Sequence, residues 1–571
     1  MTRRFVLGAA LLAAVSVGAC GGRGCTSPEA ARGREIFQTR CAVCHAATSE
    51  SAQGPGLGGV VGRRAGRLAG YSATPELAAS NLVWDEGNLD RFLAAPGVVV
   101  PGTKMAVALE NGSERHAVIA YLATLRATAT AASSAPVGAG VAPAAPTSLE
   151  GAAAYGDYRA DGPGVSRRFR PEDMPPPFVT ESARSNPEIV APPPDATLHA
   201  PPGFSVRLIA RGLAGPRRIA IAPNGDVFFV ETNTGVLRVL RLDAAGNPTA
   251  PPATFAAGLA RPFGIAFYPP GPDPQWIYVG NTDAIVRLPY RRGELAATGP
   301  AQTIVPTLSR RPGGHSTRDV IFSRDGARMF VTVGSASNVA ESGRDEAPRD
   351  LAAWQKTHGV GAAWGEEAGR AAVRVFDPEG KSERPWANGL RNCVGLAMRP
   401  DAPGDEPWCT VNERDGLGDD LAPDYVTRVR DGGFYGWPWY YIGAHEDPRQ
   451  RGARPDLRDA IVVPDVLLQP HSAPLQLAFH DGTGFGADYR GDVFVALHGS
   501  WNRKKRTGYK IVRIHLENGV PRGDYEDFVT GFVLDDAHVW GRPVGVAVAS
   551  DGALLFTEDG NGTMWRVARG N

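Results

Sequence analysis

The chain has 571 residues, and its 60 Lys and Arg are balanced by 60 Asp and Glu, so the formal net charge is zero. This length predicts two or three domains. The lack of a basic excess argues against a general nucleic-acid-binding or anionic-surface-binding protein, and leaves small neutral partners open. With 70 glycines and 48 prolines, the chain is expected to contain many turns and some linker sequence.

The first twenty residues have the pattern of an export signal. Arg3 and Arg4 precede an apolar run, Phe5 to Val17, that is too short to span a bilayer. Small residues directly before Cys20 resemble a bacterial lipoprotein box, so we expect a signal peptide over residues 1–20 and a lipidated mature N-terminus at Cys20. An ordinary cleaved signal is the alternative. Either pattern predicts export to the periplasm. In the lipoprotein pattern, the lipid at Cys20 attaches the protein to the membrane.

The motif CAVCH near the start of the chain predicts a covalent haem. Cys41 and Cys44 are spaced to bind the haem vinyl groups, and His45 supplies an imidazole for the iron. Met105, the only methionine of this part of the chain, is the expected second axial ligand, because sixty residues of loop and helix separate it from His45. His116 is the competing ligand, but it lies inside a helical pattern.

The stretches GPGLGGVVGRRAG, GYSATPEL, LVWDEGNLDRFL and VPGTKM resemble class I cytochrome c of the mitochondrial kind over residues 27–126. The resemblance implies a small all-α domain with one haem c, held by the two thioether cysteines and ligated by His45 and Met105. A sulfur ligand raises the reduction potential, which suits an electron acceptor. The lysine-rich face that docks relatives to oxidases is missing, so the external redox carrier is not specified.

The same resemblance assigns four residues around the haem. The carbonyl of Pro55 is implied to orient the His45 imidazole, and Arg63, Tyr71 and Trp84 are implied to lie near the propionates.

Residues 127–149 are almost entirely Ala, Pro, Ser and Gly, a composition that predicts a flexible linker because it buries too little apolar surface to fold. Residues 150–200 differ, since they carry aromatic side chains and the motifs MPPPF and APPPD. We expect this segment to be an extended arm packed on the domain that follows.

Six segments of the remaining chain repeat one order: a polar lead, a short apolar strand, a turn, a second strand and a polar end. This repetition predicts a six-bladed β-propeller over residues 201–571. The expected fold class is therefore multidomain, with a small all-α cytochrome c domain followed by an all-β propeller. The segments are 216–233, 262–283, 314–338, 391–415, 474–500 and 542–561.

In a propeller, the residues that lead into the innermost strands meet at one face. Most of these leading residues are arginines, and guanidinium groups suit carboxylates. The leading residues together therefore predict a site for an anionic, planar, carbonyl-rich ligand. The alternative is that each arginine pairs locally within its own blade. The leading residues are Arg217, Arg261, His315, Arg391, Asn392 and Arg542.

His315 is the candidate proton acceptor of this face. It follows Gly313 and Gly314, which let the backbone come close to a ligand, and an imidazole there is suited to take a proton near neutral pH. A structural histidine is the alternative.

Two further features lie in the fourth repeat. The segment NERDGLGDDLAPD, residues 412–424, is dense in carboxylates and glycines and is typical of a calcium site, with a solvated acidic loop as the alternative. Cys393 and Cys409 invite a disulfide in an oxidising compartment. A regular hairpin would hold them too far apart along the strand, so we expect buried free thiols.

The stretches GHSTRDVIFSRDG, GLRNCVGLA, NERDGLGDDLAPDY and LHGSWNRKKRTGYKIVRI resemble the sorbosone dehydrogenase family, which is related to soluble quinoprotein glucose dehydrogenase. The resemblance implies bound pyrroloquinoline quinone (PQQ) and calcium. It also implies that His315 is the general base for the substrate hydroxyl as hydride passes to the quinone. The implied quinone contacts are Arg391, Asn392 and Arg542, and the implied calcium ligands are the backbone carbonyls of Gly416 and Leu417.

The sequence departs from this family at two places. The quinone-contacting lysine has no clear counterpart, although the WNRKKR loop offers Arg503, Lys504 and Lys505. An insertion at about 342–363 lies near the predicted mouth. Both differences bear on the substrate more than on the cofactor.

We therefore predict a quinohaemoprotein oxidoreductase. Its propeller would oxidise a sugar, an aldose or a sorbosone-like hydroxy-aldehyde, and the electrons would pass through haem c to an external cytochrome or terminal oxidase. One alternative is a calcium-dependent lactonase-like hydrolase, which needs a cage of carboxylate and asparagine side chains in the channel. The other is a non-catalytic binding propeller with an electron-transfer module.

Overall fold

The computed structural model forms two units, Met1–Ala132 and Ser133–Asn571. The predicted signal peptide with Cys20, the haem cysteine Cys44, Tyr71 and linker residues 127–147 lie outside the described residues. No helix within the described ranges is long and apolar enough to cross a membrane. The described residues are 27–42, 45, 47, 54–68, 73–103, 105, 107–125, 148–194, 196–309, 313–340, 347–402, 404–480 and 484–570.

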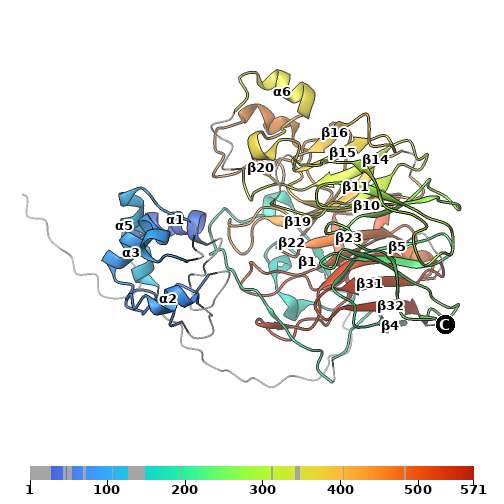
Figure 1. Cartoon of the computed structure of the whole chain (residues 1–571), viewed down its shortest axis with the longest axis horizontal. Coiled ribbons are helices and arrows are strands. Elements are labelled where there is room, and N and C mark those ends of the chain that lie inside the picture. The colour runs from blue at the N-terminus through green and yellow to red at the C-terminus, as the bar shows by residue number, and fades with distance from the viewer. Residues whose placement is uncertain are drawn as a thin grey trace, which may run out of the picture. The chain divides into compact units, whose positions relative to one another are not determined.

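The first unit is helical and is drawn in blue in Figure 1. Polar side chains cap four of its helices at their N-termini, and Pro lies at the start of three, as helix initiation favours. The first and last helices pack closely because Gly33 has no side chain: a Cβ there would lie 1.7 Å from the Ala117 carbonyl oxygen. The helices are α1 (Pro28–Ile36), α2 (Pro75–Ala79), α3 (Glu86–Ala94), α4 (Pro96–Val99) and α5 (Gly112–Thr124), with a π-helical turn over Phe37–Cys41.

Among its described residues, the second unit contains six blades of four antiparallel strands, which confirms the predicted propeller. Five blades are separate four-stranded sheets, and the fifth blade is extended to six strands by two strands from the segment before the propeller. The first blade is β5 (Pro216–Ile221), β6 (Val227–Glu231), β7 (Val236–Leu240) and β8 (Ala253–Ala256). The second is β9 (Ile265–Tyr268), β10 (Trp276–Gly280), β11 (Ile285–Pro289) and β12 (Gln302–Val305). The third is β13 (Val320–Phe322), β14 (Met329–Val333), β15 (Ala372–Phe376) and β16 (Arg384–Asn388).

The remaining blades follow the same order. The fourth is β17 (Cys393–Met398), β18 (Pro407–Val411), β19 (Pro423–Arg428) and β22 (Val466–Pro470). The fifth is β23 (Pro474–Phe479), β24 (Val493–Leu497), β25 (Lys510–Ile514) and β28 (Asp524–Val529). Short hairpins pair β20 (Tyr440–Tyr441) with β21 (His445–Glu446) and β26 (Leu516–Glu517) with β27 (Val520–Pro521).

The sixth blade joins the two ends of the propeller. It contains β30 (Pro543–Val548), β31 (Leu554–Glu558) and β32 (Thr563–Arg569), and its outer strand is β4 (Phe204–Ala210) from the beginning of the unit. Figure 1 shows β31, β32 and β4 side by side. The innermost strands β5, β9, β13, β17, β23 and β30 contact one another in a closed ring.

A polar layer crosses this inner ring. Glycine lies directly before one inner strand (Gly264, before β9) and within two others (Gly395 in β17 and Gly545 in β30), and a Cβ at each would lie within 3 Å of backbone atoms of the neighbouring blade. The other three inner strands contribute polar side chains, within the strand or directly before it, and these form cross-links between blades. Arg218 pairs with Asp319, and the Gln476 amide bonds to the backbone of Ile219. Burial raises the pKa of Asp319 to about 6 although Arg218 opposes the rise.

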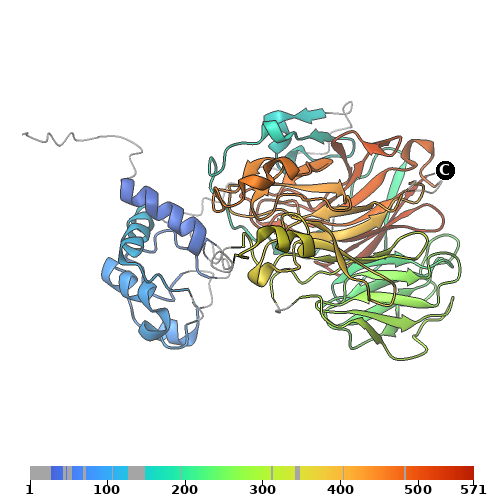
Figure 2. The ribbon, with the colours of Figure 1, turned by 90° about the horizontal axis from the view of Figure 1, so that it is seen from above.

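The segment before the propeller lies along its fifth blade. Strand β2 (Ser166–Arg168) pairs with β28 and with β1 (Ser148–Glu150), and β3 (Glu188–Ile189) pairs with β29 (His538–Val539). Figure 2 shows this segment, in teal, beside the orange strands. The fully buried Arg167 lies 2.8 Å from the carboxylates of both Asp161 and Asp527, so the segment is joined to the blade by buried ion pairs.

The prediction of free thiols at Cys393 and Cys409 is wrong, because these residues form a disulfide. A bulge in β17 between Cys393 and Leu396 shifts the register, so that Cys393 pairs with Val411 while Leu396 pairs with Cys409. The Cα atoms of the two cysteines consequently lie 5.9 Å apart, within disulfide reach. The prediction of free thiols rests on a regular hairpin, which lacks this bulge.

Candidate functional site

The helical unit contains an apolar cavity of about 400 Å³. The predicted axial ligands His45 and Met105 both line it, together with the predicted attachment residue Cys41. An apolar cavity with an imidazole and a thioether in its wall fits a haem of the cytochrome c type. Further lining residues are Arg63, Trp84, Phe92, Val118 and Leu122.

The His45 imidazole is fixed by its neighbours. Its Nδ1 donates to the Pro55 carbonyl oxygen over 2.8 Å, as the resemblance implied, and a metal-ligating histidine commonly donates its other ring N–H in this way. Gly54 is required at this position because a Cβ would lie 2.4 Å from the imidazole Cε1. The competing ligand His116 is exposed on α5 and does not line the cavity.

In the propeller, the residues leading into the inner strands lie at one mouth of the ring. Arg217, Arg261 and Arg542 line a single cavity of about 210 Å³, although they come from the first, second and sixth blades. The next two residues after His315, Ser316 and Thr317, line the same cavity.

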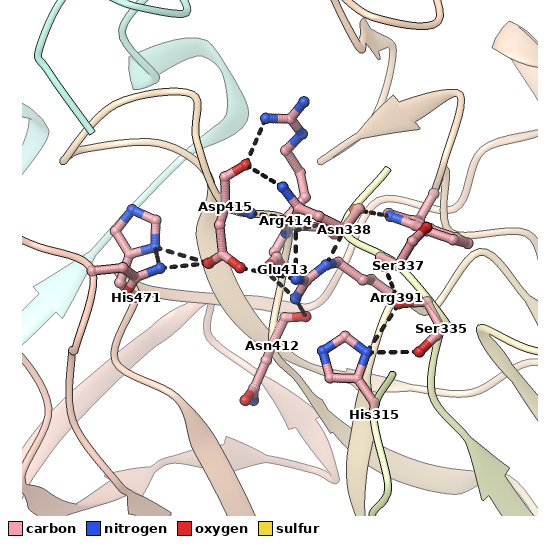
Figure 3. Close-up of polar contacts among 12 residues, drawn as sticks. His315, Ser335, Ser337, Asn338, Arg391, Asn412, Glu413, Arg414, Asp415 and His471 are labelled. Atoms are coloured by element: carbon pink, nitrogen blue, oxygen red, sulfur yellow. Dashed lines mark hydrogen bonds and ion pairs between the residues drawn. The ribbon is translucent and has the colours of Figure 1, made fainter. Parts of the chain in front are cut away.

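His315 is held as a neutral imidazole. Its Nδ1 lies 3.0 Å from the carbonyl oxygen of Ser335, which can only accept, so Nδ1 carries the proton. Nε2 has no partner among the described residues and keeps its lone pair. Burial, and then the nearby charge of Arg391, hold the pKa of His315 well below its usual range. Figure 3 shows the imidazole beside Ser335.

Arg391 is enclosed by protein oxygen atoms. Its guanidinium donates to the carbonyl of Glu413 over 2.8 Å, to the Asn338 side chain over 3.0 Å and to the Asp415 carboxylate over 2.9 Å. Weaker bonds reach the carbonyls of Asn338 and Asn412. Figure 3 shows this network. Arg391 therefore fixes the loops that end β14 and β18, and only its faces are available for a ligand.

Asn392 lies next to His315 and has an unsatisfied acceptor. Its Oδ1 is buried without a hydrogen-bond partner, and both Oδ1 and the His315 Cβ lie close to the position that a Cβ would take at Gly334. A buried polar atom without a partner is unfavourable. This atom therefore offers an acceptor to a donor group on a ligand.

Asp559 organises the opposite side of the mouth. Its carboxylate accepts from Arg217 over 2.7 Å and from Arg542 over 2.9 Å, and it lies 3.0 Å from Nε2 of His498. These three groups hold the pKa of Asp559 well below its usual range against the effect of burial. Burial in turn lowers the pKa of His498, with Asp559 opposing.

The predicted calcium carbonyls lie in the loop after β18. The Leu417 carbonyl accepts from the Phe178 backbone N–H over 2.6 Å, and the Gly418 carbonyl accepts from His471. The Leu417 oxygen keeps a second lone pair, and the Gly416 oxygen has no donor among the described residues, so both are compatible with a cation ligand role. Calcium remains a prediction.

The WNRKKR loop faces the segment before the propeller. The Arg503 guanidinium donates to the carbonyls of Tyr155 and Gly156 and to the Asp420 carboxylate, and Lys505 lies 3.6 Å from Asp157. The adjacent Asn502 instead donates to Asp415, beside Arg391. In the described insertion, helix α6 (Leu351–His358) packs near β16.

Comparison with known proteins gives two matches along the chain. The TrAA12-like family model matches residues 198–419 and 455–570, and the cytochrome c family model matches residues 30–126. Cytochrome c2 of Rhodomicrobium vannielii is 38% identical over 21% of this chain and 91% of its own length.

A PQQ-dependent pyranose dehydrogenase of Coprinopsis cinerea is 26% identical over 66% of this chain, which spans just over half, 56%, of that relative. Its PQQ domain has a solved structure that is 24% identical, with a TM-score of 0.52 and coverage of 66% of this chain and 98% of that one. A family AA12 structure from Trichoderma reesei is 22% identical, with a TM-score of 0.53 and coverage of 67% and 99%. These two structures show the fold.

The predicted fusion of a cytochrome c domain with a quinoprotein-dehydrogenase-like propeller is thereby confirmed, and the relatives of the two parts make the chain an oxidoreductase with an electron-transfer domain. More than half of the chain matches one family model, so the protein belongs to the TrAA12-like family and carries a cytochrome c domain ahead of the propeller.

Proposed function

We propose that this protein is a quinohaemoprotein dehydrogenase that oxidises a sugar or a related hydroxy-aldehyde at the propeller mouth and passes the electrons to its own haem. The observation that carries the proposal is the state of His315. Its Nδ1 proton is fixed on Ser335 and its Nε2 is free of partners among the described residues, next to the unsatisfied Oδ1 of Asn392.

The residues of the mouth fit a quinone with several carboxylates. Arg542 and Arg217 supply guanidinium groups at the cavity, and the buried Arg391 supplies a rigid planar face next to His315. When bound, pyrroloquinoline quinone supplies a two-electron acceptor to this site. The relationship to a PQQ-dependent pyranose dehydrogenase supports that cofactor.

His315 has the protonation state that a general base needs. Oxidation of a hydroxyl group releases one proton from oxygen and a hydride from carbon. The Nε2 lone pair accepts the proton, and the Nδ1 bond to Ser335 orients the ring. Because the pKa of His315 lies well below its usual range, the base remains neutral in mildly acidic solution. Arg370 and Arg318 bind the His315 carbonyl and hold the backbone in place.

The helical unit supplies the exit for electrons. Haem c, when attached, is a one-electron carrier, and His45 and Met105 would be its axial ligands. We further propose that the protein works in the periplasm as a lipoprotein anchored at Cys20, and that calcium binds the carbonyls of Gly416 and Leu417. The experiment below identifies which compound of the sugar class is oxidised.

The test uses the full-length protein with haem attached, loaded with PQQ and calcium. Aldoses, ketoses and hydroxy-aldehydes are added, and haem reduction is followed by its absorbance. We expect reduction by at least one sugar, with a rate that stays constant as the pH falls through about 6.5, the usual pKa of histidine. Quinone-loaded protein whose haem is reduced by none of these compounds would refute the proposal. Loss of activity with a chelator, restored by calcium, tests the cation.

A further inference from the structure

The cavity next to His315 has an excess of positive charge. Among the described residues that line it, the charged side chains are Arg217, Arg261 and Arg542 against the single carboxylate of Asp559. His498 contacts Asp559 from outside the lining, and its lowered pKa keeps it neutral near pH 7. Three guanidinium groups and one carboxylate give the protein two excess positive charges at the cavity. Arg217 and Arg542 are the groups proposed above for the quinone carboxylates, so Arg261 is the guanidinium that remains for another anion.

Asp559 compensates only part of the cluster. Its two oxygen atoms are taken by Arg217, Arg542 and His498. The neighbouring Glu558 is buried and accepts from the backbone of Asn561 and from Thr563, and it does not line the cavity. Burial lowers the pKa of Arg217 and Asp559 opposes the shift, while the nearby positive charges of Arg542 and Arg261 lower the pKa further.

Arg261 is the member of the cluster that protein groups leave open. Its side chain is exposed to solvent where it lines the cavity, and its guanidinium makes no hydrogen bond and no ion pair with any described residue. Its backbone has a φ of 53°, a left-handed conformation that is unfavourable for arginine. The Pro262 carbonyl accepts from Thr232, another lining residue, so the backbone next to Arg261 is tied to the wall of the cavity.

We infer that the substrate is a sugar carrying an anionic group, a carboxylate or a phosphate, which binds Arg261 while the hydroxyl that is oxidised lies at His315. This inference rests on the proposed function. A guanidinium fork recognises planar or tetrahedral oxyanions through two parallel hydrogen bonds. Ser316 and Thr317 connect the position of the anionic group with the position of the oxidised hydroxyl. They follow His315 in the chain and line the same cavity as Arg261.

The experiment compares sugars that differ only in charge. The haem-containing, quinone-loaded protein is given glucose, glucuronate and glucose 6-phosphate, and then galactose and galacturonate, and kcat/KM is measured from haem reduction. We expect at least one anionic sugar to exceed its neutral partner by tenfold or more. We expect Arg261→Gln to reduce that ratio by at least tenfold, whereas Arg292→Gln, an exposed arginine outside the cavity, leaves the ratio unchanged. Glucuronate against glucose 6-phosphate distinguishes the two anions.

Two binding measurements separate the outcomes. Titration of PQQ into Arg261→Gln is expected to give the wild-type affinity; a loss of PQQ affinity without a change in sugar preference would assign the cluster to the quinone and overturn the inference. Equal kcat/KM for neutral and anionic sugars would overturn it too, while leaving the proposed function intact. If no sugar reduces the haem, thermal stabilisation by glucuronate that is lost in Arg261→Gln shows that the anion site stands and that the dehydrogenase function fails.

Discussion

The two sides of the propeller mouth differ in how fully their charges are satisfied. On the side of the third and fourth blades, Arg391 is enclosed by five hydrogen bonds to protein oxygen atoms. On the side of the sixth, first and second blades, Arg217 and Arg542 share one carboxylate and Arg261 has no partner among the described residues. We conclude that the first side holds its side chains in a fixed geometry. The second side has guanidinium groups that can bind an anionic ligand.

The largest effect is expected from removing the base on the fixed side. His315→Ala should lower kcat by about 10³-fold, because general base catalysis contributes roughly 10²–10⁴-fold. PQQ affinity should stay near that of the wild type. Haem reduction by the best sugar measures the rate, and titration measures the affinity. The exposed His199→Ala is the control, and a variant at His315 that turns over normally would disprove its role.

The enclosure of Arg391 gives the next largest effect. Arg391→Lys keeps the charge but replaces five directed hydrogen bonds with an ammonium group that cannot span the same oxygen atoms. We expect kcat/KM to fall by about 10²-fold, as for a misplacement near 1 Å. Arg384→Lys changes an exposed ion pair with Asp431 and serves as the matched control. Equal activity of both variants would show that the fixed geometry is unnecessary.

The disulfide stabilises the blade that carries Arg391. It closes a loop of sequence separation 16, and loops of this size predict a loss of about 3 kcal/mol in the free energy of unfolding when the bond is removed. Urea unfolding of Cys393→Ala/Cys409→Ala measures this loss, and reduced wild-type protein should show a similar one. An unfolding midpoint that is the same in the oxidised wild type, the double variant and the reduced wild type would contradict the prediction.

The smallest effect concerns a buried carboxyl behind Arg391. Burial raises the pKa of Glu413 to about 8, and that of Asp424 to about 7. An unfolded carboxyl group has a pKa of about 4.3. At pH values between about 4.3 and the raised values, the folded protein holds protons that the unfolded chain has lost. The free energy of unfolding therefore falls as the pH rises through this range, by roughly 1–3 kcal/mol. Urea unfolding at pH 5 and pH 8 should show the fall.

Glu413→Gln removes this titration and keeps a hydrogen-bonding acceptor for the Arg414 N–H. Its stability should therefore depend less on pH than that of the wild type. The exposed Glu172→Gln is expected to behave as the wild type does. An identical pH dependence in Glu413→Gln would show that another group is responsible.

Much of the architecture was predictable because repeats encode it. The polar lead of each repeat placed Arg217, Arg261 and Arg542 at one mouth, and the structure gathers them in one cavity. The polar end of each repeat carries an equal signal for residues at this mouth. Antiparallel pairing returns the end of each second strand to the start of the first, which places Asn338 and Asp559 beside leading residues and His498 beside Asp559.

Features that depend on departures from regular strand pairing were not predictable. The bulge in β17 that brings Cys393 to Cys409 recurs at the start of β5, β23 and β30, but the alternation of apolar residues does not indicate it. The enclosure of Arg391 depends on contacts from the loops after β14 and β18, which are distant in sequence. Periodicity predicts which residues face the channel, but it does not predict which charges the protein satisfies itself.

The closure of the ring by β4 and β32 sets an order for folding. The fourth strand of the sixth blade is made first and its partners are made last, so the propeller stays open until β30, β31 and β32 have left the ribosome. Asp559 follows β31, and it joins Arg542 of that blade to Arg217 of the first blade across the same seam. The cavity lined by the three arginines therefore forms only when the sixth blade closes the ring. An incompletely synthesised chain has no assembled anion site.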